Sequence, residues 1–123
     1  MFRIAGIDHV QLAGPPGCED RARWFFGEVL GMAELPKPEA LRARGGVWFA
    51  CGKHQLHIGI EPEFQPAWKA HPAIRVQGLA GLKARLSQAG MRFAEDTLLP
   101  DAARTYVDDP FGNRLEFVEP AGR

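Results

Sequence analysis

The order of predicted strands and helices in this chain of 123 residues runs through once and then starts again. Each half begins with an alternating strand, continues with an amphipathic helix and ends with three short strands. Both helices stop at a glycine followed by a methionine, and these pairs, Gly31-Met32 and Gly90-Met91, lie 59 residues apart. His57 and Glu116, each central in the last strand of its half, are also 59 residues apart. The chain is therefore predicted to be a tandem repeat of one supersecondary unit.

The boundaries of the repeat follow from apolar periodicity and from glycine and proline breaks. The first module covers about 4–60, with strands expected at 4–12, 32–35, 46–50 and 54–60, a helix at 18–30 and a loop at 36–44. The second covers about 71–119, with strands expected at 71–77, 91–94, 103–107 and 113–119 and a helix at 79–89. The connection 61–70 has too many prolines for a regular element and too many aromatics for a free linker, so we expect it to pack on the protein. By size, residues 1–123 make a single domain.

Composition and charge exclude several classes of function. Fifteen basic residues balance fifteen acidic ones, which is not the basic footprint of a nucleic-acid-binding protein. No apolar run approaches the roughly 20 residues that span a bilayer, and the first residues lack the apolar core of a signal peptide. Two cysteines, Cys18 and Cys51, are too few for a disulfide framework. We therefore expect a cytoplasmic protein with reduced thiols and with no nucleic-acid or membrane partner.

The last two predicted strands are joined by Asp109-Pro110-Phe111-Gly112-Asn113, a run typical of a β-hairpin turn. In the second of these strands, Glu116 lies between two large apolar residues, Leu115 and Phe117. A carboxylate in the middle of a strand needs either a solvated face or a partner such as a metal ion.

Three histidines and Glu116 occupy equivalent positions of the two halves, His9 with His71 and His57 with Glu116. His9 and His71 lie in the first strand of each half, 62 residues apart, and His57 lies in the last strand of the first half. All four side chains fall on the more polar face of their strands, whereas His54 has the opposite parity. Taken singly, each histidine is compatible with a hydrogen-bonded, half-buried role. Taken together, three imidazoles and a carboxylate that converge where two sheets curl together predict a site for a divalent transition metal.

These residues belong to a pattern that resembles a known superfamily. The segments that carry the resemblance are Ile7–Leu12, Ala22–Phe26 with Leu30-Gly31-Met32, Leu56–Gly59, His71–Ile74 and Asp109–Glu116. Together they resemble the vicinal oxygen chelate superfamily, which contains glyoxalases, extradiol dioxygenases, fosfomycin-resistance thiol transferases and bleomycin-resistance proteins. The resemblance covers nearly the whole chain, and the Asp-Pro-x-Gly-Asn-x-x-Glu form of the last segment is its most specific part. It implies an α+β, glyoxalase-like fold in which two tandem βαβββ modules form curved mixed sheets around a central cavity, with the helices outside.

The resemblance also implies a metal centre. His9, His71 and Glu116 match the His-His-Glu ligands of the dioxygenases and thiol transferases, and the expected cofactor is one divalent ion: Fe, Mn, Ni, Co or Zn. His57 falls where glyoxalases usually place a glutamate that is both ligand and proton shuttle. It is therefore expected as a fourth ligand or as a catalytic base. The implied chemistry is chelation of the ion by two neighbouring oxygens of a small-molecule substrate.

Charged and hydroxyl side chains of the second half are candidates for the rest of the site. Arg75 and Arg114 share faces with the expected ligands, and they suit either a substrate carboxylate or surface ion pairs. Tyr106 neighbours the strand of Glu116 and suits either proton transfer to the substrate or cross-strand packing.

The first half offers further candidates for substrate contacts. Gln11 shares the face of His9. Trp48, Phe64 and Trp68 suit an apolar pocket or, more simply, core packing.

Three functions fit this pattern. The favoured one is a metal-dependent lyase or isomerase of glyoxalase type that acts on a small oxygenated molecule. The second is an extradiol-type dioxygenase that uses Fe(II) on a His-His-Glu triad. The third is a metal-free, drug-binding dimer like the bleomycin-resistance proteins, which the full set of metal ligands disfavours because a binding cavity has no need of them.

The small number of strands in one module predicts that the module must associate with another. Four strands make only half of a barrel, so each sheet must close against another module, either in the same chain or in a second one. The resemblance favours a twofold homodimer in which His9 and His57 of one chain face His71 and Glu116 of the other.

Overall fold

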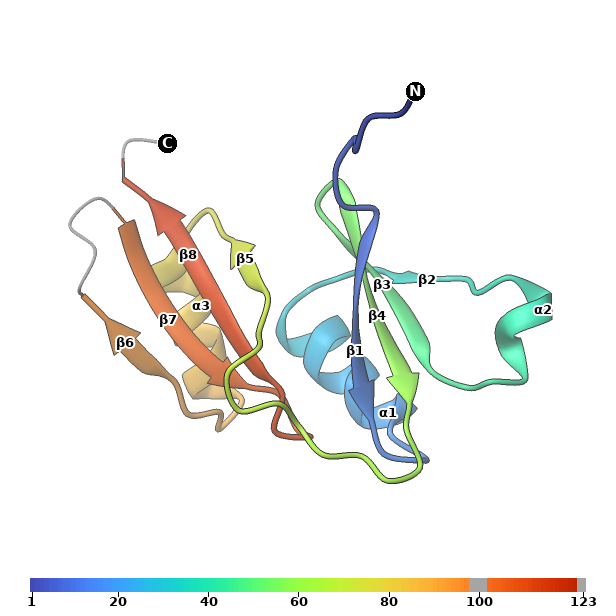
Figure 1. Ribbon diagram of the computed structural model, residues 1–123. Helices are drawn as coiled ribbons and strands as arrows, with labels where there is room; N and C mark the ends of the chain where they lie inside the picture. The colour runs from blue at the N-terminus through green and yellow to red at the C-terminus, as the bar shows by residue number, and fades with distance from the viewer. Residues whose placement is uncertain (98–101, 122–123) are drawn as a thin grey trace. The chain divides into compact units, whose positions relative to one another are not determined.

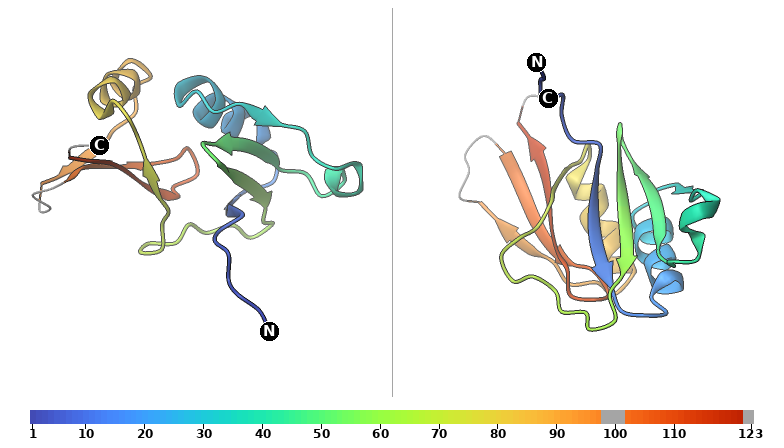
Figure 2. Two further views of the ribbon diagram at one scale, coloured as in Figure 1. Left: turned by 90° about the horizontal axis from the view of Figure 1, so that it is seen from above. Right: turned by 45° about the vertical axis from the view of Figure 1, so that its right-hand side comes forward.

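The computed structural model describes residues 1–97 and 102–121. Its internal contacts divide the chain into two units, Met1–Phe64 and Gln65–Arg123. Each unit holds one four-stranded sheet, and the strand orders, β1-β4-β3-β2 and β5-β8-β7-β6, are the same in both (Figure 1). Helices cover one face of each sheet (Figure 2). The predicted α+β repeat is therefore confirmed.

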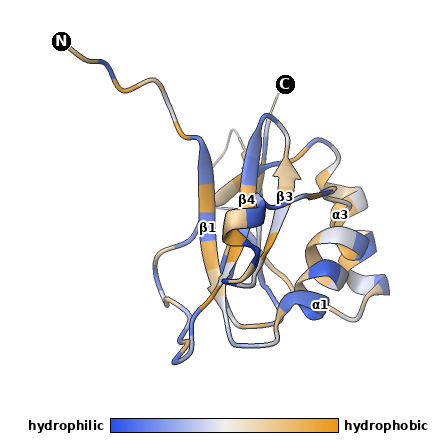
Figure 3. Ribbon diagram, turned by 90° about the vertical axis from the view of Figure 1, so that its right-hand side faces the viewer, coloured by the Kyte–Doolittle hydropathy of each residue, from blue (hydrophilic) through white to orange (hydrophobic). Residues whose placement is uncertain are grey.

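The first unit contains seven helices and strands among its described residues. They are β1 (His9–Gly14), α1 (Glu19–Ala22), η1 (Arg23–Val29), β2 (Glu34–Leu35), α2 (Glu39–Arg42), β3 (Val47–Cys51) and β4 (His54–Ile60). β1 is parallel to β4, and β3 is antiparallel to both β4 and β2. The alternation of hydrophilic and hydrophobic residues along β1 is visible in Figure 3. It places the apolar residues against the helices, where the largest buried side chains are Phe25, Phe26, Phe49, Ile58 and Val47.

The second unit repeats this arrangement with one long helix. Its elements are β5 (Ala73–Arg75), α3 (Leu79–Gln88), β6 (Ala94–Asp96), β7 (Ala102–Asp108) and β8 (Arg114–Pro120). The carboxylate of Glu119 accepts hydrogen bonds from the backbone N–H groups of Gly78 (2.6 Å) and Leu79 (3.0 Å) at the start of α3. These two bonds hold the pKa of Glu119 below its ordinary value. The end of β8 thereby caps the helix that covers its own sheet.

The turn between β7 and β8 is built around a buried carboxylate. Asp109 is 4% exposed, and its side chain accepts hydrogen bonds from the backbone N–H groups of Phe111 (2.9 Å) and Asn113 (2.8 Å) and from the Asn113 amide (2.8 Å). Burial raises the pKa of Asp109 against the opposing effect of these bonds. Gly112 adopts a left-handed conformation (φ 91°), which only glycine tolerates without strain.

Replacing Asp109 with alanine is expected to lower the free energy of unfolding by about 2–4 kcal/mol, because three donors lose their acceptor inside the protein. Urea denaturation measures this difference. The neighbouring Asp108 is exposed, so Asp108→Ala is the matched control and is expected to change stability by no more than about 0.5 kcal/mol. Equal effects of the two substitutions would show that the buried turn does not depend on its carboxylate.

Several predicted boundaries need correction. The first strand begins at His9 rather than at residue 4, and the apolar side chains before it, Ile4 and Ile7, are 80% and 66% exposed. The predicted loop at 36–44 contains one helical turn, α2. The second part of the predicted helix at 18–30 is a π-helix, in which the Leu30 N–H donates to the Phe25 carbonyl oxygen at 2.9 Å.

The connection 61–70 forms no helix or strand, as predicted. Its Pro66 lies against Gly112 of the β7–β8 turn, so the connection packs on the second unit. Trp68 is 92% exposed, which overturns the core-packing role considered for it. No helix among the described residues is long and apolar enough to cross a membrane.

Candidate functional site

Three of the predicted site residues of the first unit form one row across its sheet. Gln11 of β1 is paired with His57 of β4, and His57 is paired in turn with Trp48 of β3. Residues that are directly paired in a sheet present their side chains on the same face. Strand parity therefore correctly predicted that Gln11 and His57 share a face, and the register adds Trp48 to it.

The imidazole of His57 lies between two other rings. The Trp48 indole is stacked on one side with a centroid distance of 3.9 Å and an angle of 4° between the planes, and the His9 ring is stacked at 4.1 Å and 18°. Nε2 of His57 is 2.8 Å from Oε1 of Gln55. His57 is only 3% exposed, whereas the side chain of His9 is 40% exposed and its Nδ1 is 2.9 Å from Oδ1 of Asp8.

This environment lowers the pKa of His57. Burial is the largest cause, the neighbouring His9 is the next, and Lys37 adds to them, while the Asp8 carboxylate opposes them. The ring is therefore a neutral imidazole in neutral solution, able to accept a proton or bind a metal. Lone pairs of ring nitrogens lie in the ring plane, so two nearly parallel rings do not direct them at one point. His9 and His57 would share an ion only after one ring turned.

The second unit brings His71 and Glu116 together. Nε2 of His71 is 3.0 Å from Oε1 of Glu116, and the two side chains are 20% and 11% exposed. Nδ1 of His71 is 2.8 Å from the Lys69 carbonyl oxygen, which can only accept a hydrogen bond, so Nδ1 carries a proton.

Both nitrogens of His71 thus face oxygen atoms. Without a metal, a proton must lie between Nε2 of His71 and the Glu116 carboxylate, because two bare acceptors repel each other at 3.0 Å. With Nδ1 protonated, a cation that bound Nε2 and the Glu116 carboxylate would satisfy both groups. Metal–ligand bonds of about 2.1 Å place neighbouring ligand atoms about 3 Å apart, which is the spacing observed. A carbonyl oxygen that fixes the histidine tautomer is also a usual outer partner of a metal ligand. The pair therefore fits a divalent ion.

An arginine that sequence reasoning missed contacts the same carboxylate. Arg104 donates to Oδ2 of Asp96 at 2.6 Å and to Oε2 of Glu116 at 3.5 Å, and its Nε is buried with no hydrogen-bond partner among the described residues. Arg104 has the same strand parity as Tyr106, which is paired with Glu116, so the two side chains lie on the same face of β7.

Two of the other predicted site residues of the second unit, Tyr106 and Arg114, lie near the His71–Glu116 pair, and Arg75 does not. The Arg114 guanidinium carbon is 4.3 Å from the centroid of the Tyr106 ring, a cation–π contact. The same ring makes a T-shaped contact with His71, with centroids 5.7 Å apart and planes at 75°. Arg75 is exposed on β5, opposite Val118. Tyr106 thus connects Arg114 to His71, whereas Arg75 is not part of this cluster.

No group of three or more histidine, cysteine, aspartate or glutamate side chains suited to a metal occurs within residues 1–97 and 102–121. The candidate donors occur instead as two pairs, His9 with His57 in the first unit and His71 with Glu116 in the second. The predicted four-residue metal set is therefore not assembled within either unit alone.

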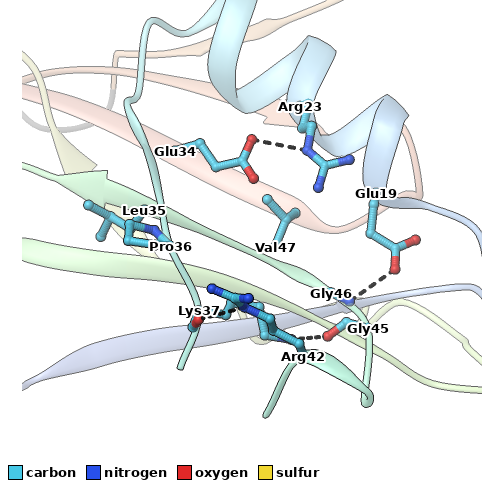
Figure 4. A pocket seen from close by; sticks show the side chains of 10 residues that line it. All are labelled: Glu19, Arg23, Glu34, Leu35, Pro36, Lys37, Arg42, Gly45, Gly46 and Val47. Carbon is cyan, nitrogen blue, oxygen red and sulfur yellow. Dashed lines mark hydrogen bonds and ion pairs between the residues drawn. The ribbon is translucent and has the colours of Figure 1, made fainter. Parts of the chain in front are cut away.

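The first unit also contains two cavities. The larger, of about 410 Å³, lies beside α1, β2 and the 36–46 segment (Figure 4). In this cavity Arg23 donates to Glu34 at 3.0 Å, and the Glu19 carboxylate accepts a hydrogen bond from the Gly46 N–H at 3.0 Å. The smaller cavity, of about 180 Å³, is lined in part by Gln11 and Trp48, which belong to the row that contains His57. The sequence-predicted substrate contacts of this unit therefore line the smaller cavity.

Solved structures resemble the chain over nearly its whole length. A protein from Bacillus anthracis assigned to the glyoxalase family is 52% identical, with a TM-score of 0.94 and with 98% of each chain covered. Lactoylglutathione lyase from Agrobacterium tumefaciens is 20% identical, with a TM-score of 0.72 and 94% of each chain covered. The fosfomycin resistance protein FosX from Listeria monocytogenes is 14% identical, with a TM-score of 0.79 and with 98% of this chain and 97% of that one covered.

No protein-family model and no curated protein matches the chain. The two structures at 20% and 14% identity establish the fold alone. The Bacillus anthracis relative, at 52% identity over 98% of both chains, establishes kinship. This chain therefore belongs to the glyoxalase family, within the vicinal oxygen chelate superfamily.

Proposed function

We propose that the protein is a cytoplasmic, metal-dependent lyase or isomerase of glyoxalase type that acts on a small oxygenated molecule. The observation that carries the proposal is the His71–Glu116 pair, whose spacing of 3.0 Å and protonated Nδ1 suit two ligands of one ion. Membership of the glyoxalase family supports the same reaction class.

The proposed ligands are His9, His71 and Glu116, with one divalent ion among Fe, Mn, Ni, Co and Zn. Two imidazoles and a carboxylate suit these metals better than calcium or magnesium, which prefer oxygen ligands alone. When bound, such an ion would stabilise negative charge that develops on two neighbouring oxygens of the substrate.

Two side chains near the proposed metal ligands have different roles in the proposed reaction. His57, neutral and stacked between Trp48 and His9, accepts a proton from the substrate or serves as a fourth ligand. Tyr106, held by Arg114 on one side and next to His71 on the other, orients the substrate or returns the proton.

We further propose a twofold homodimer in which His9 and His57 of one chain meet His71 and Glu116 of the other. Two observations support an assembly. β1 and β5 lie at the edges of their sheets and are therefore open to pairing. Large apolar side chains also stay exposed in the single chain, with Phe2 at 89% and Trp68 at 92%.

Metal binding to the native protein tests the proposed function directly. Protein stripped with a chelator is expected to gain thermal stability when one of Mn²⁺, Ni²⁺, Co²⁺, Zn²⁺ or Fe²⁺ is added. At 100 times Kd, binding adds about 2.7 kcal/mol to the free energy of unfolding. No shift with any of the five ions would refute the proposal.

A second function is favoured by one specific observation. Because the nearly parallel stack keeps His9 and His57 from sharing an ion as they stand, only one of these two histidines joins His71 and Glu116, and the family resemblance favours His9. Two histidines and one carboxylate with open positions are typical of ferrous oxygenases. Oxygen consumption by the Fe²⁺-loaded protein with a catechol substrate, absent with Zn²⁺, would identify that chemistry over the lyase or isomerase.

A further inference from the structure

The smaller cavity of the first unit has an unusual charge composition. Gln11, Trp48 and Gly59 line it from the sheet, and Lys37, Leu41 and Arg44 line it from the 36–46 segment. Among the residues that the structure describes, the lining contains two cations and no carboxylate. The cavity therefore presents positive charge beside the row that holds His57.

The 36–46 segment is held together by its own hydrogen bonds and packs against β4 at Gly46. The Lys37 ammonium donates to the Gly45 carbonyl oxygen, and the Arg42 Nε donates to the Lys37 carbonyl oxygen at 3.3 Å. Gly45 and Gly46 both adopt left-handed conformations (φ 73° and 89°), and a Cβ on Gly46 would collide with the Ile58 carbonyl oxygen. The cation of Lys37 is therefore held at a defined place at the edge of the cavity.

In the part of the chain that the structure describes, the two cations of the cavity lack the carboxylate partners that Arg23 and Arg104 have. Arg23 pairs with Glu34 and Asp20, and Arg104 pairs with Asp96 and Glu116. Arg44 makes no ion pair with any residue of the described ranges, and the hydrogen bond of Lys37 to a carbonyl leaves its charge uncompensated. Trp48, which lines the cavity, is stacked on His57. An anion bound here would therefore lie next to the row formed by Gln11, His57 and Trp48.

The sheet side of the cavity offers complementary groups. Gly59 has no side chain, and a Cβ there would collide with the amide of Gln11, so the glycine makes room for Gln11 to reach the cavity. Trp48 adds apolar surface, and its stack on His57 links the cavity to the histidine pair. A volume of about 180 Å³ is below the roughly 300–1,000 Å³ of drug-sized sites, so the ligand group is small.

We propose that Lys37 and Arg44 form an oxyanion subsite, and that the substrate of the proposed enzyme is a small acid whose carboxylate or phosphonate binds there against Trp48 and Gln11. That the bound acid is a substrate rests on the proposed function. The anion site itself needs no metal. The guanidinium of Arg44 supplies planar, paired donors for an oxyanion, and the ammonium of Lys37 supplies a point charge.

The test is a titration of the full-length, metal-free, ¹⁵N-labelled protein, followed by two-dimensional NMR. The probes are pyruvate, its neutral amide pyruvamide, and methylphosphonate. We expect saturable shifts of the Trp48 indole N–H and of Gln11 and Gly59 with at least one acid, and none with pyruvamide. Preference between the two acids identifies the substrate as carboxylic or organophosphorus.

The variants Lys37→Gln and Arg44→Gln are each expected to weaken the binding of the acid by about tenfold or more, because each removes a charged hydrogen-bond donor. Lys53→Gln, which removes one positive charge from the exposed β3–β4 turn of the same unit, is the matched control and should bind as the wild type does. The spectra of the variants also report whether each one is folded.

Three results would overturn the inference: no saturable shift with either acid, equal binding of pyruvamide, or equal weakening by Lys53→Gln. The outcome is separable from that of the proposed function. Loss of anion binding with metal binding intact rejects only the subsite, whereas anion binding in a protein that takes no metal rejects only the metal enzyme.

Discussion

Replacing Glu116 with glutamine is expected to lower the affinity for the activating metal by at least about 100-fold, more than the loss of an outer-shell partner costs. The amide keeps the size of the side chain but cannot carry the negative charge that a divalent ion requires. In the metal-free protein it can donate to Nε2 of His71, whose other nitrogen stays bonded to the Lys69 carbonyl. Stability should therefore change little without metal and should fail to rise when metal is added.

Calorimetric titration of the stripped protein gives the affinity, and melting with and without metal gives the stability. Glu95→Gln is the matched control, since it removes the same charge from β6 of the same sheet, where Glu95 pairs with Lys83 at the surface. We expect it to bind metal as the wild type does. Unchanged affinity in Glu116→Gln would remove this carboxylate from the ligand set.

Strand parity accounts for most of what the sequence predicted about the site. Side chains alternate with a period of two, so the apolar pattern that buries Leu56 and Ile58 necessarily turns His57 to the other face. In the second half, the strand predicted at 71–77 is shorter, with β5 at Ala73–Arg75, so His71 lies just before the strand, where it contacts Glu116 of β8. Parity assigns faces without any knowledge of strand order, which is why it succeeds on a single sequence.

The start of the first strand shows where parity fails. Residues 4–8 alternate as well as those after them, but a strand needs a partner. In β4 the paired residues begin at Gln55, opposite His9, and β4 itself begins at His54. No strand of the unit extends far enough to pair with Ile4 or Ile7, and this limit is set by the β3–β4 turn rather than by the residues themselves.

Contacts made by long side chains also could not be predicted from the sequence. Arg104 was overlooked because an arginine in a strand is usually a surface group, and its pairing with Asp96 depends on the register of β6 against β7. The positively charged cavity also could not be predicted from the sequence, because it depends on the path of the backbone. Lys37 and Arg44 lie in a segment without periodicity, and only the left-handed turn at Gly45 and Gly46 brings them over Trp48 and Gln11.

Mixing two inactive variants is expected to restore metal binding if the site is shared between chains. In the proposed homodimer, His9→Ala damages the half-site of the first unit and Glu116→Ala damages that of the second. A heterodimer of these two variants carries one doubly damaged site and one intact site. Each variant alone has every site damaged, so neither should bind metal tightly.

The two variants carry different affinity tags, are unfolded together, refolded, and purified by both tags in succession. The isolated heterodimer should then bind about one metal ion per pair of chains, with the affinity of the wild type. The matched control mixes His71→Ala with Glu116→Ala. Both changes fall in the second unit, so every site of that heterodimer is damaged in either architecture and no binding should return.

The outcome discriminates between a metal site shared by two chains and a metal site built within one chain. Each unit holds two of the four donors, so both pairs are required, but one chain can in principle supply both. If confirmed heterodimers of His9→Ala with Glu116→Ala bind no metal, each chain builds its own site. A monomer in light scattering at micromolar concentration would reject the dimer itself. Recovery of one ion per heterodimer, with none in the control, requires the half-sites to come from different chains, because no other pairing leaves all four donors intact.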